Sequence, residues 1–388
     1  MVRIAYINTY CDGSTASLVD TITSQLDESF SYKKFYGRLK KHKKGWTYIG
    51  KNKFLNFVDN FFTFIFGKIG HFHFYETKKL IRKLKDFDPD IIHFQNLHGN
   101  YLNFLLLGKY LSSFRGQVIF TLHDQFLLTG RCALISQECN KWQTGCCGCK
   151  NLSRYPRALI DKSKRLHLEK LRFFEMIRNP IFVCPSKWML NIYNSSLLSK
   201  YKAHQIYNGV IGPFKYCKQP TKQLLFVANP WSKEKGSEVI NQLFSLIDRN
   251  KYTLLVVGVD SKTKELFDPN IKTIGVVDKN TINRLFSESF CFVNPTFLDN
   301  LPTVLIESIQ NGCPCVTFDT GGCSEIVNDN VGVVVKEKTA EGIIRGIMDI
   351  ERKSFVETDF KQAFDVFSAK NCSAKYKELY LSSLKYEK

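Results

Sequence analysis

Short apolar runs alternate with helical patterns throughout this chain, and this alternation restricts the fold more than any other feature. Such runs, separated by amphipathic stretches, are typical of parallel sheets whose strands are joined by crossover helices. In the first half we expect strands at 3–8, 90–95, 117–123 and 180–184, with helices at 14–26 and 160–176. The pattern then restarts, with strands expected at 223–228, 252–257, 271–276, 290–294 and 315–318. The sequence therefore predicts an α/β fold built from two parallel sheets.

The length of the chain agrees with two domains, because 388 residues exceed the size at which one hydrophobic core keeps growing. Residues 209–222 are rich in turn formers and lack periodicity, so we place a hinge there. The predicted domains are residues 1–208 and 223–365. The final helical stretch, about Phe355 to Tyr386, is long for a domain end, and its last part, 366–388, can cross back to pack on the first domain.

Composition narrows the class of protein. The chain is 44% hydrophobic and 23% charged, as expected for a soluble globular protein rather than a disordered one. Its apolar stretches are interrupted well before the roughly 20 residues needed to span a bilayer, and its first residues run directly into a strand pattern. We therefore expect neither a transmembrane helix nor a signal peptide. A formal charge of +19 indicates an anionic partner, which can be nucleic acid, an anionic membrane or a phosphorylated small molecule.

The first strand is followed by the turn Tyr10–Ala16, which lacks the spaced glycines of a dinucleotide-binding fingerprint. Hydride-transfer chemistry therefore loses its main support. Ser14 is the expected N-cap of the next helix, and the free backbone N–H groups around Gly13 can face an anion. An ordinary turn has the same sequence features, so ligand contact at Gly13 is one of two interpretations.

The most informative segment is Asn294–Ser308, followed later by the turn and helix Gly321–Val327. Its pattern predicts a strand, a polar loop, a helix, a second strand and a Gly-Gly turn into another helix. Asp299 and Glu307 are eight positions apart and are expected at the carboxyl edge of a parallel sheet, where ligands bind in such folds. An Asp before a helix can also act only as a cap, and for Asp299 this alternative stays open.

This segment resembles the motif of the family 4 retaining glycosyltransferases of the GT-B fold. The shared pattern is an acidic residue, seven others and a Glu, followed by Gly-x-Pro and then Gly-Gly-x-x-Glu-Ile-Val. The family usually has Glu where this chain has Asp299, but an Asp-Asn-Leu-Pro loop is common in members of capsule and exopolysaccharide (colanic-acid-type) biosynthesis. The resemblance implies two Rossmann-like domains facing an interdomain cleft. It also implies that Glu307 binds the nucleotide ribose, while Asp299 and the backbone of Asn300 and Leu301 hold sugar hydroxyls.

The segment Phe226–Gly236 resembles the family's first strand of the donor domain, which ends in Lys-Gly. The family usually has an Arg shortly before this Lys, and here Lys233 stands in that neighbourhood, ahead of Lys235. Two ammonium groups at a strand end beside a helix N-terminus suit a diphosphate whose charge grows as its glycosidic bond breaks. A pair of solvated lysines is the alternative. On the first interpretation the ammonium groups take the role of a metal ion, so the chemistry requires no cofactor.

In the first half, residues 89–99 and 118–124 resemble the family's two inner strands. His123 falls at a sheet edge, where family members place a histidine against the donor sugar. The resemblance thus adds His123 to Asp299 and Lys235 as candidate catalytic residues. A strand-end histidine can instead serve only as a structural hydrogen bonder.

Four cysteines in the segment 129–150 have the spacing C-x6-C-x6-C-x2-C: Cys132, Cys139, Cys146 and Cys149. Four thiolates on a glycine-containing loop can surround one tetrahedral zinc ion. A cysteine-rich insertion also occurs at this place in a subset of the family. We therefore expect a structural zinc site, with Cys147 as a spare ligand. Free thiols or a disulfide are the alternative, because the first two spacings are longer than those of common zinc knuckles.

A basic segment precedes an apolar helical face. Residues 33–53 contain nine Lys or Arg and no acidic residue. The helical face that follows comprises Phe54, Phe57, Val58, Phe61, Phe62, Ile65, Phe66 and Ile69. Together they predict an interfacial helix held on an anionic membrane surface by basic charge and buried Phe side chains. Burial of the same face in the core of the first domain is the alternative.

These observations predict a retaining glycosyltransferase of bacterial cell-surface polysaccharide biosynthesis. We expect transfer from a nucleotide-sugar donor to a glycan acceptor, itself expected to be lipid-linked, in the cytoplasm on the inner face of the plasma membrane. Retention follows from the resemblance alone, with the departing phosphate accepting the proton of the acceptor hydroxyl. A nucleotide-sugar epimerase or hydrolase of the same fold is one alternative. A basic zinc-containing nucleic-acid-binding protein is another, but it leaves the loop at Asp299 unexplained, so we expect no nucleic-acid partner.

Overall fold

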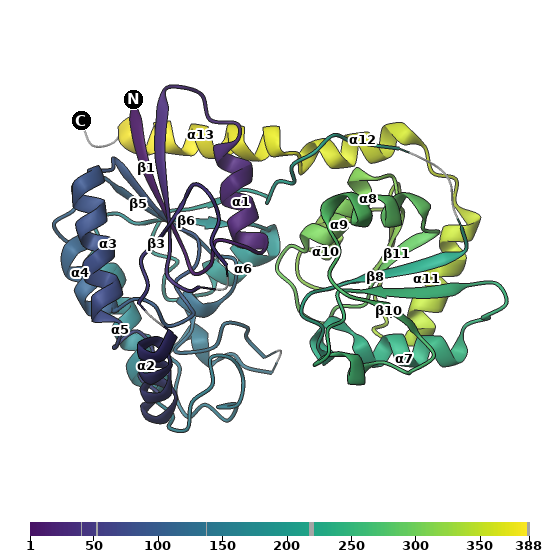
Figure 1. The fold of residues 1–388 in the computed structure, drawn as a ribbon, viewed down its shortest axis with the longest axis horizontal. Coiled ribbons are helices and arrows are strands. Elements are labelled where there is room, and N and C mark those ends of the chain that lie inside the picture. The colour runs from purple at the N-terminus through teal and green to yellow at the C-terminus, as the bar shows by residue number, and fades with distance from the viewer. Residues whose placement is uncertain (40, 52, 137, 217–220, 386–388) are drawn as a thin grey trace. The chain divides into compact units, whose positions relative to one another are not determined.

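The computed structural model describes residues 1–39, 41–51, 53–136, 138–216 and 221–385 (Figure 1). The chain divides into two compact units: unit 1 is Met1–Ile206 with Cys372–Lys388, and unit 2 is Tyr207–Asn371. Each unit contains one parallel β-sheet with helices on both faces. The prediction of an α/β fold with two parallel sheets is therefore confirmed. Residues 217–220 of the expected hinge lie outside the described residues.

Unit 1 has a seven-stranded sheet in the order β3-β2-β1-β4-β5-β6-β7, and every pair of neighbours is parallel. Its strands are β1 (Val2–Asn8), β2 (Phe30–Tyr36), β3 (Trp46–Tyr48), β4 (Ile91–Phe94), β5 (Gln117–Thr121), β6 (Ile181–Cys184) and β7 (Ala203–Gln205). Its helices are α1 (Ser14–Thr23), α2 (Lys53–Phe66), α3 (Phe74–Phe87), α4 (Phe104–Leu111), α5 (Ser163–Glu175), α6 (Lys187–Asn194) and α13 (Ala369–Lys385).

This sheet is buried on both faces because its inner strands are continuous apolar runs. In β1, Ala5 and Ile7 point into one hydrophobic cluster, whereas Ile4 and Tyr6 point into another. Helices α3 to α6 contribute to the first cluster, and α1 and α13 contribute to the second. The two-residue period of the strand thus places alternate side chains under two separate helical layers.

Two tyrosines of α13 hold this helix against the sheet. The Tyr380 hydroxyl lies 3.1 Å from the Tyr6 hydroxyl and 2.8 Å from His93 Nδ1. The Tyr376 hydroxyl lies 3.2 Å from Thr121 Oγ1. All five side chains are buried, so their polar atoms are satisfied by one another. The helical stretch expected as one segment at the end of the chain is in fact two helices, because α12 (Glu357–Val366) ends before α13 begins.

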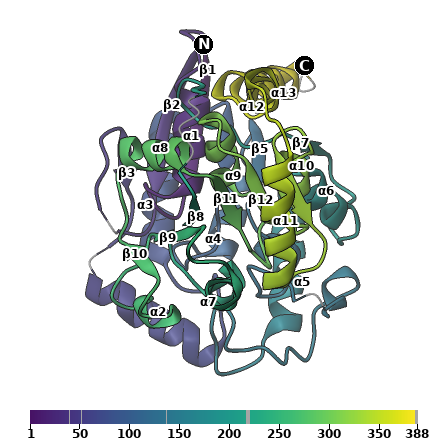
Figure 2. The ribbon, with the colours of Figure 1, turned by 90° about the vertical axis from the view of Figure 1, so that its right-hand side faces the viewer.

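Unit 2 has a six-stranded parallel sheet in the order β10-β9-β8-β11-β12-β13. Its strands are β8 (Gln223–Val227), β9 (Thr253–Val257), β10 (Lys272–Ile274), β11 (Cys291–Asn294), β12 (Cys315–Phe318) and β13 (Gly332–Val335). Its helices are α7 (Ser237–Leu246), α8 (Lys279–Glu288), α9 (Thr303–Gln310), α10 (Cys323–Ile326), α11 (Ala340–Arg352) and α12. Helices α7 and α11 cover one face, with α11 across β12 and β13, and α8 and α9 cover the other (Figures 1 and 2).

The strand order contains a reversal in each sheet, between β1 and β4 in unit 1 and between β8 and β11 in unit 2. From each of these pairs the chain proceeds outward in opposite directions. Loops that leave the carboxyl ends of such a pair diverge, and the space between them is where ligands bind in doubly wound sheets. The topology therefore predicts that the loops after β8 and β11 bind the ligand of unit 2.

The basic segment 33–53, expected to help hold the following helix on a membrane, is partly built into the sheet of unit 1. It supplies part of β2 and all of β3, while Lys40 and Asn52 lie outside the described residues. Its aromatic residues Phe35, Tyr36, Trp46 and Tyr48 favour strand pairing, which outweighs the polar composition. Lys34 forms a 2.8 Å ion pair with Asp20, so part of the basic charge is neutralised within the unit.

Candidate functional site

Two loops meet at the strand-order reversal of unit 2. The loop after β8 carries Lys235, and the loop after β11 carries Asp299. The Phe297 N–H donates to the Glu234 carbonyl at 2.8 Å, which joins the two loops through their backbones. The Lys235 ammonium then donates to Asp299 Oδ2 at 2.6 Å. Both side chains keep part of their surface exposed, 34% for Lys235 and 21% for Asp299, so a ligand can reach the pair.

The Gly-Gly turn after β12 braces the Asp299 loop from the other side. Gly322 N–H donates to the Asn300 carbonyl at 2.8 Å. Gly321 has a φ of +56°, and a Cβ atom there would lie 1.7 Å from the Asp299 carbonyl oxygen. On the β8 side, Gly236 has a φ of +88°, and its Cβ would lie 2.3 Å from the Pro295 carbonyl oxygen. Only glycine allows these close approaches, so the glycines set the position of the carboxylate.

Asp299 does not cap α9. The N-cap position of α9 is Pro302, and no side chain accepts a hydrogen bond from the first turn of this helix. Instead, Asp299 Oδ1 accepts from the Asn300 N–H at 2.9 Å while Oδ2 accepts from Lys235. Asn300 and Leu301, expected beside Asp299 as sugar-binding residues, are both largely buried. The carboxylate is therefore held by its own loop and by one lysine.

Glu307 lies in α9 and has a different cationic partner. Its Oε1 lies 3.0 Å from the ammonium nitrogen of Lys279, the first residue of α8. The structure thus gives the two carboxylates of the motif two separate lysines. Lys279 escaped sequence reasoning, although it begins the helix that follows β10 and so belongs to the same carboxyl edge of the sheet. That position is the signal that could have identified it.

Lys233 is separated from this arrangement. It forms a 2.6 Å pair with Glu238, and both side chains are well exposed. The neighbouring Glu238 carboxylate raises the pKa of Lys233. An exposed pair of this kind contributes little to stability. The structure therefore brings Lys235, but not Lys233, into contact with Asp299.

Two helix N-termini add positive potential near the pair. Helix α7 follows Gly236 directly and α9 follows Pro302, and neither has a side-chain cap. The first N–H groups of such helices are unpaired within the helix, and the helix dipole favours an anion there. Within the described chain, the buried Ser237 hydroxyl at the start of α7 also has no hydrogen-bond partner. This edge of unit 2 can therefore receive a phosphate group.

In unit 1, His123 lies just beyond the end of β5. Its Nε2 lies 2.9 Å from Gln95 Oε1, an acceptor that requires the proton on Nε2. Burial lowers the pKa of His123 to about 4, so the ring is neutral at pH 7. The neighbouring residue, Asp124, has a lowered pKa. Burial acts to raise this pKa, but the His98 side chain, 2.7 Å away, outweighs the effect of burial. A neutral imidazole suits hydrogen bonding to a hydroxyl rather than ion pairing.

The N-cap of helix α1 is Gly13, not Ser14 as expected. Helix α1 begins at Ser14, with Gly13 as its N-cap and no side-chain cap. Gly13 has a φ of +81°, and a Cβ there would meet no atom within 4 Å. The expectation that Ser14 caps this helix is therefore wrong, because the left-handed backbone places glycine at the cap. The exposed N–H groups of α1 still leave room for an anion beside Gly13.

The four cysteines of the segment 129–150 lie in a loop region of unit 1. Among the described residues, the set of three or more possible metal ligands whose atoms lie within 4.8 Å of one another is Asp59, His73 and Glu76. The thiols of Cys132, Cys139, Cys146 and Cys149 are not gathered to that extent in this conformation. Cys146 Sγ accepts from Gly130 N–H at 3.1 Å, and burial with the neighbouring Cys149 raises the pKa of Cys132 to about 11. The zinc site stays a prediction.

Family comparisons agree with this geometry. The family described as glycosyl transferases group 1 matches residues 213–364, and Glycosyltransferase Family 4 matches residues 50–211. A relative from Escherichia coli, WcaC, carries the name of a colanic acid biosynthesis glycosyl transferase and is 24% identical over 274 residues. That match covers 64% of this chain and 65% of the relative. The chain thus spans just under two thirds of the length of this curated relative.

Solved structures extend the likeness to the whole chain. Sucrose-phosphate synthase from Thermosynechococcus elongatus superposes with a TM-score of 0.66 at 14% identity, over all of both chains. HepE from Anabaena, solved with UDP and glucose, gives a TM-score of 0.68 at 13% identity and covers 98% of this chain and all of its own. At such identities the likeness shows the GT-B fold alone. Together with the two family matches, which follow one another along the sequence, it confirms the resemblance: the chain belongs to the family 4 glycosyltransferases of the GT-B fold.

Proposed function

We propose that the protein is a glycosyltransferase that takes a sugar from a nucleotide-sugar donor and adds it to a glycan acceptor. The observation that carries this proposal is the partly exposed Lys235–Asp299 pair beside two uncapped helix N-termini in unit 2. A cation and free N–H groups bind a diphosphate, and the carboxylate beside them binds hydroxyl groups. A nucleotide sugar carries both kinds of group next to each other.

The proposed donor-binding roles follow from the partners of each side chain. Lys235 contacts the diphosphate and stabilises the negative charge that develops on it as the glycosidic bond breaks. The Asp299 carboxylate accepts hydrogen bonds from sugar hydroxyls. The backbone groups of Asn300 and Leu301 form further hydrogen bonds with the sugar. Glu307 accepts hydrogen bonds from the ribose hydroxyls, beside its ion-pair partner Lys279. Lys233 makes no direct contact with the diphosphate in this proposal, because it is paired with Glu238.

We infer that the reaction proceeds with retention and without a catalytic metal ion. Lys235 and the N-termini of α7 and α9 supply the positive charge that a divalent cation supplies in other transferases. The acceptor hydroxyl loses its proton to the departing phosphate on the same face of the sugar, so no side-chain base is required. His123, neutral at pH 7 with its one ring proton directed to Gln95, contacts the donor sugar rather than an anionic group.

The acceptor and setting are proposed from the relatives. The name of WcaC points to exopolysaccharide assembly, which supports a glycan acceptor of cell-surface polysaccharide or capsule biosynthesis. Such acceptors grow on lipid carriers, so we propose a lipid-linked substrate and a protein peripheral to the inner face of a bacterial plasma membrane. Within the described chain no helix has the length and apolarity to cross a bilayer.

Thermal-shift measurements with a panel of nucleotides and nucleotide sugars test this proposal. HepE was solved with UDP and with UDP-glucose, so uridine compounds are the first probes. A ligand at about 100 times its Kd stabilises the folded protein by about 2.7 kcal/mol. Product anomers from an active donor, identified by NMR, then report retention or inversion. If no compound of the panel raises the Tm, the donor site is wrong, and if the donor turns over equally without acceptor, the protein is a hydrolase or epimerase.

A further inference from the structure

Helix α2 turns its apolar face to solvent. Phe54 and Phe57 expose 72% and 66% of their surface, and Phe61 and Phe62 are exposed as well. On the other side, Asn56 and Thr63 are buried. A surface helix of a soluble domain ordinarily has the reverse orientation. Several adjacent exposed phenylalanines indicate a surface that binds something apolar.

The polar side of α2 is anchored, so this orientation is built into the unit. Asp59 of α2 forms a 2.5 Å pair with Lys51 and lies 3.5 Å from His73 Nδ1. His73 in turn lies 3.3 Å from Glu76 of α3, which is fully buried. Turning the Phe face inward would pull Asp59 away from these partners and leave buried polar groups unpaired. The outward Phe face is therefore the arrangement that the surrounding residues select.

The apolar surface continues onto the chain that leads into α5. Leu159 N–H donates to the Phe64 carbonyl at 2.9 Å, which joins this segment to α2. Leu159 and Ile160 are exposed by 60% and 43%, and Leu168 of α5 is exposed as well. An apolar strip thus runs from α2 to the first turns of α5.

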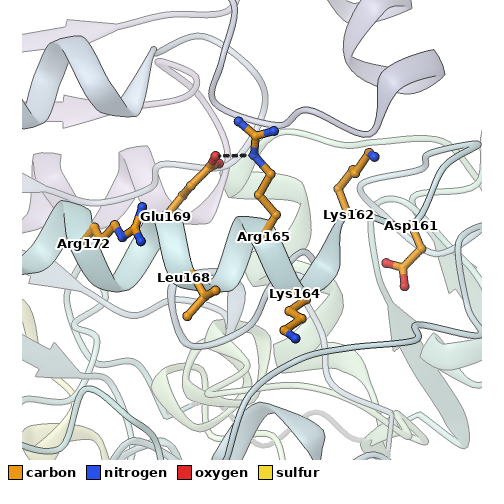
Figure 3. Close-up of a pocket in the computed structure, with 7 residues that line it drawn as sticks. All are labelled: Asp161, Lys162, Lys164, Arg165, Leu168, Glu169 and Arg172. Carbon is orange, nitrogen blue, oxygen red and sulfur yellow. Dashed lines mark hydrogen bonds and ion pairs between the residues drawn. The ribbon is translucent and has the colours of Figure 1, made fainter.

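A basic groove of about 460 Å³ lies at the end of this strip, along α5 (Figure 3). It is lined by Asp161, Lys162, Lys164, Arg165, Leu168, Glu169 and Arg172. Asp161 already accepts from the N–H groups of Cys149 and Ser163, both at 2.8 Å. Glu169 accepts from Arg165 at 2.8 Å and pairs with His71 at 3.1 Å. The acidic groups of the groove are therefore already engaged.

Three cations of the groove have no such partner. Within the described residues, no carboxylate pairs with Lys162, Lys164 or Arg172. In contrast, the basic segment upstream of α2 is partly neutralised, because Lys34 and Lys43 both pair with Asp20. The α5 groove therefore adds unpaired positive charge next to the Phe face, which the sequence order alone does not reveal.

We propose that α2, residues 159–160 and the α5 groove form one membrane-docking surface, with Phe side chains in the bilayer interface and lipid phosphates in the groove. Phosphate oxygens match the guanidinium and ammonium groups that lack partners. The charge also argues against a second copy of this chain as the occupant, since a symmetric pair would bring two positive grooves together. This inference concerns a surface of unit 1 and does not depend on the sugar transferred.

Sedimentation of the full chain with vesicles tests the proposal. Wild type is expected to bind phosphatidylcholine vesicles that contain phosphatidylglycerol, and to bind pure phosphatidylcholine weakly. The groove variant Lys164→Glu with Arg172→Glu should bind the anionic vesicles at least about tenfold more weakly. The face variant Phe57→Ser with Phe61→Ser should lose about tenfold or more, because it removes buried apolar area. Circular dichroism melts establish that each variant is folded.

Two controls separate this surface from bulk properties. Lys272→Glu with Lys336→Glu makes the same change in net charge on exposed lysines of unit 2, and Leu246→Ser with Met348→Ser removes comparably exposed apolar side chains. Both controls should bind like wild type, within about twofold. The proposal is overturned if wild type fails to sediment with anionic vesicles at low salt, or if a control loses as much binding as its partner variant. It is also overturned if light scattering finds a dimer that the face variant disrupts. No nucleotide sugar is needed, so failure here leaves the proposed activity untouched.

Discussion

At the scale of single residues, the candidate site depends on pairs that lie far apart in the sequence. Lys235 and Asp299 are 64 positions apart but in contact, and Glu307 pairs with Lys279 of another helix. The sequence predicted Asp299, Glu307 and Lys235, because each follows a recognisable strand. It did not predict Lys279 as a partner or the separation of Lys233 from the pair. Side-chain pairing depends on loop shape, which strand and helix patterns do not specify.

These pairings make a prediction about turnover. Lys235→Ala and Glu307→Gln should each lower turnover by roughly two orders of magnitude or more, as for removal of a charge contact in the transition state. The fold should be nearly unaffected, because a partly exposed ion pair contributes only about 0–1 kcal/mol. Initial rates of nucleotide release in the presence of acceptor measure the effect.

Lys233→Ala is the matched control for Lys235→Ala. It removes the same type of side chain two positions away, but its partner Glu238 lies on the exposed surface. We expect a loss of less than about fivefold. Equal losses for Lys233→Ala and Lys235→Ala would refute the distinction between the two lysines, and near-normal rates in both Lys235→Ala and Glu307→Gln would remove the donor-site assignment.

At the scale of elements, the turn after β12 acts on the loop after β11. Gly321→Ala combines left-handed backbone strain with a Cβ that would lie 1.7 Å from the Asp299 carbonyl oxygen. We expect a loss of about 3 kcal/mol or more in unfolding free energy and a fall in turnover, because the Asp299 loop must shift. Gly45→Ala is the control, since Gly45 also has positive φ but a Cβ there meets nothing within 4 Å. That variant should show only strain, about 1 kcal/mol, with unchanged turnover. Urea denaturation and initial rates distinguish the two.

The cysteine-rich loop carries a second prediction at this scale. Protein purified under reducing conditions should contain about one zinc ion per chain, held by Cys132, Cys139, Cys146 and Cys149. Removal of the ion with a chelator should then lower the Tm, because a structural zinc site contributes to folding directly. Elemental analysis that finds no zinc in reduced protein ends this hypothesis in favour of free thiols.

Helix α2 illustrates what periodicity can and cannot predict. The spacing of Phe54, Phe57 and Phe61 predicted both the helix and its apolar face. It left open whether that face lies in the core or outside, because periodicity defines a face and not its surroundings. The answer depends on Asp59 and its partners Lys51 and His73, which lie outside the periodic pattern.

At the scale of the whole molecule, the doubled strand pattern predicted the two sheets, and nine expected strands correspond to observed ones. The strands that the sequence did not reveal lie mostly at sheet edges, namely β2, β3, β7 and β13. Two adjacent lysines interrupt the apolar pattern of β2, and β3 has only three residues, so neither gives a recognisable apolar run. The sequence also did not predict the break between α12 and α13, because the helical periodicity continues across it.

The distribution of histidines predicts how the molecule responds to acid. All eight histidines lie in unit 1. Burial lowers the pKa of His123 to about 4 and that of His93 to about 3, from the ordinary 6.5. Between those values the unfolded chain binds more protons than the folded one, so stability is full above pH 6.5 and is lost as the pH falls toward 4. His123 and His93 each contribute about 1 kcal/mol per pH unit in that window.

Urea denaturation at pH 7.5 and at pH 5.5, followed by hydrogen exchange, tests this expectation. Unit 1 should lose protection first at the lower pH, while unit 2 keeps it. His123→Gln should reduce the pH dependence, because glutamine keeps a polar side chain but does not titrate. Two results would contradict the role of the buried histidines: an equal loss of protection in both units, or the same dependence of unfolding free energy on pH in His123→Gln as in wild type.

The pairing of α13 with β1 has a consequence for biosynthesis. Tyr6 is synthesised before unit 2, but its partner Tyr380 is made only after all of unit 2. A nascent chain can therefore complete unit 2 while one face of the first sheet still lacks its last helix. Domains commonly fold in the order in which they are synthesised, but here the unit begun first is finished last. During that interval the exposed sheet face is a natural client for a chaperone.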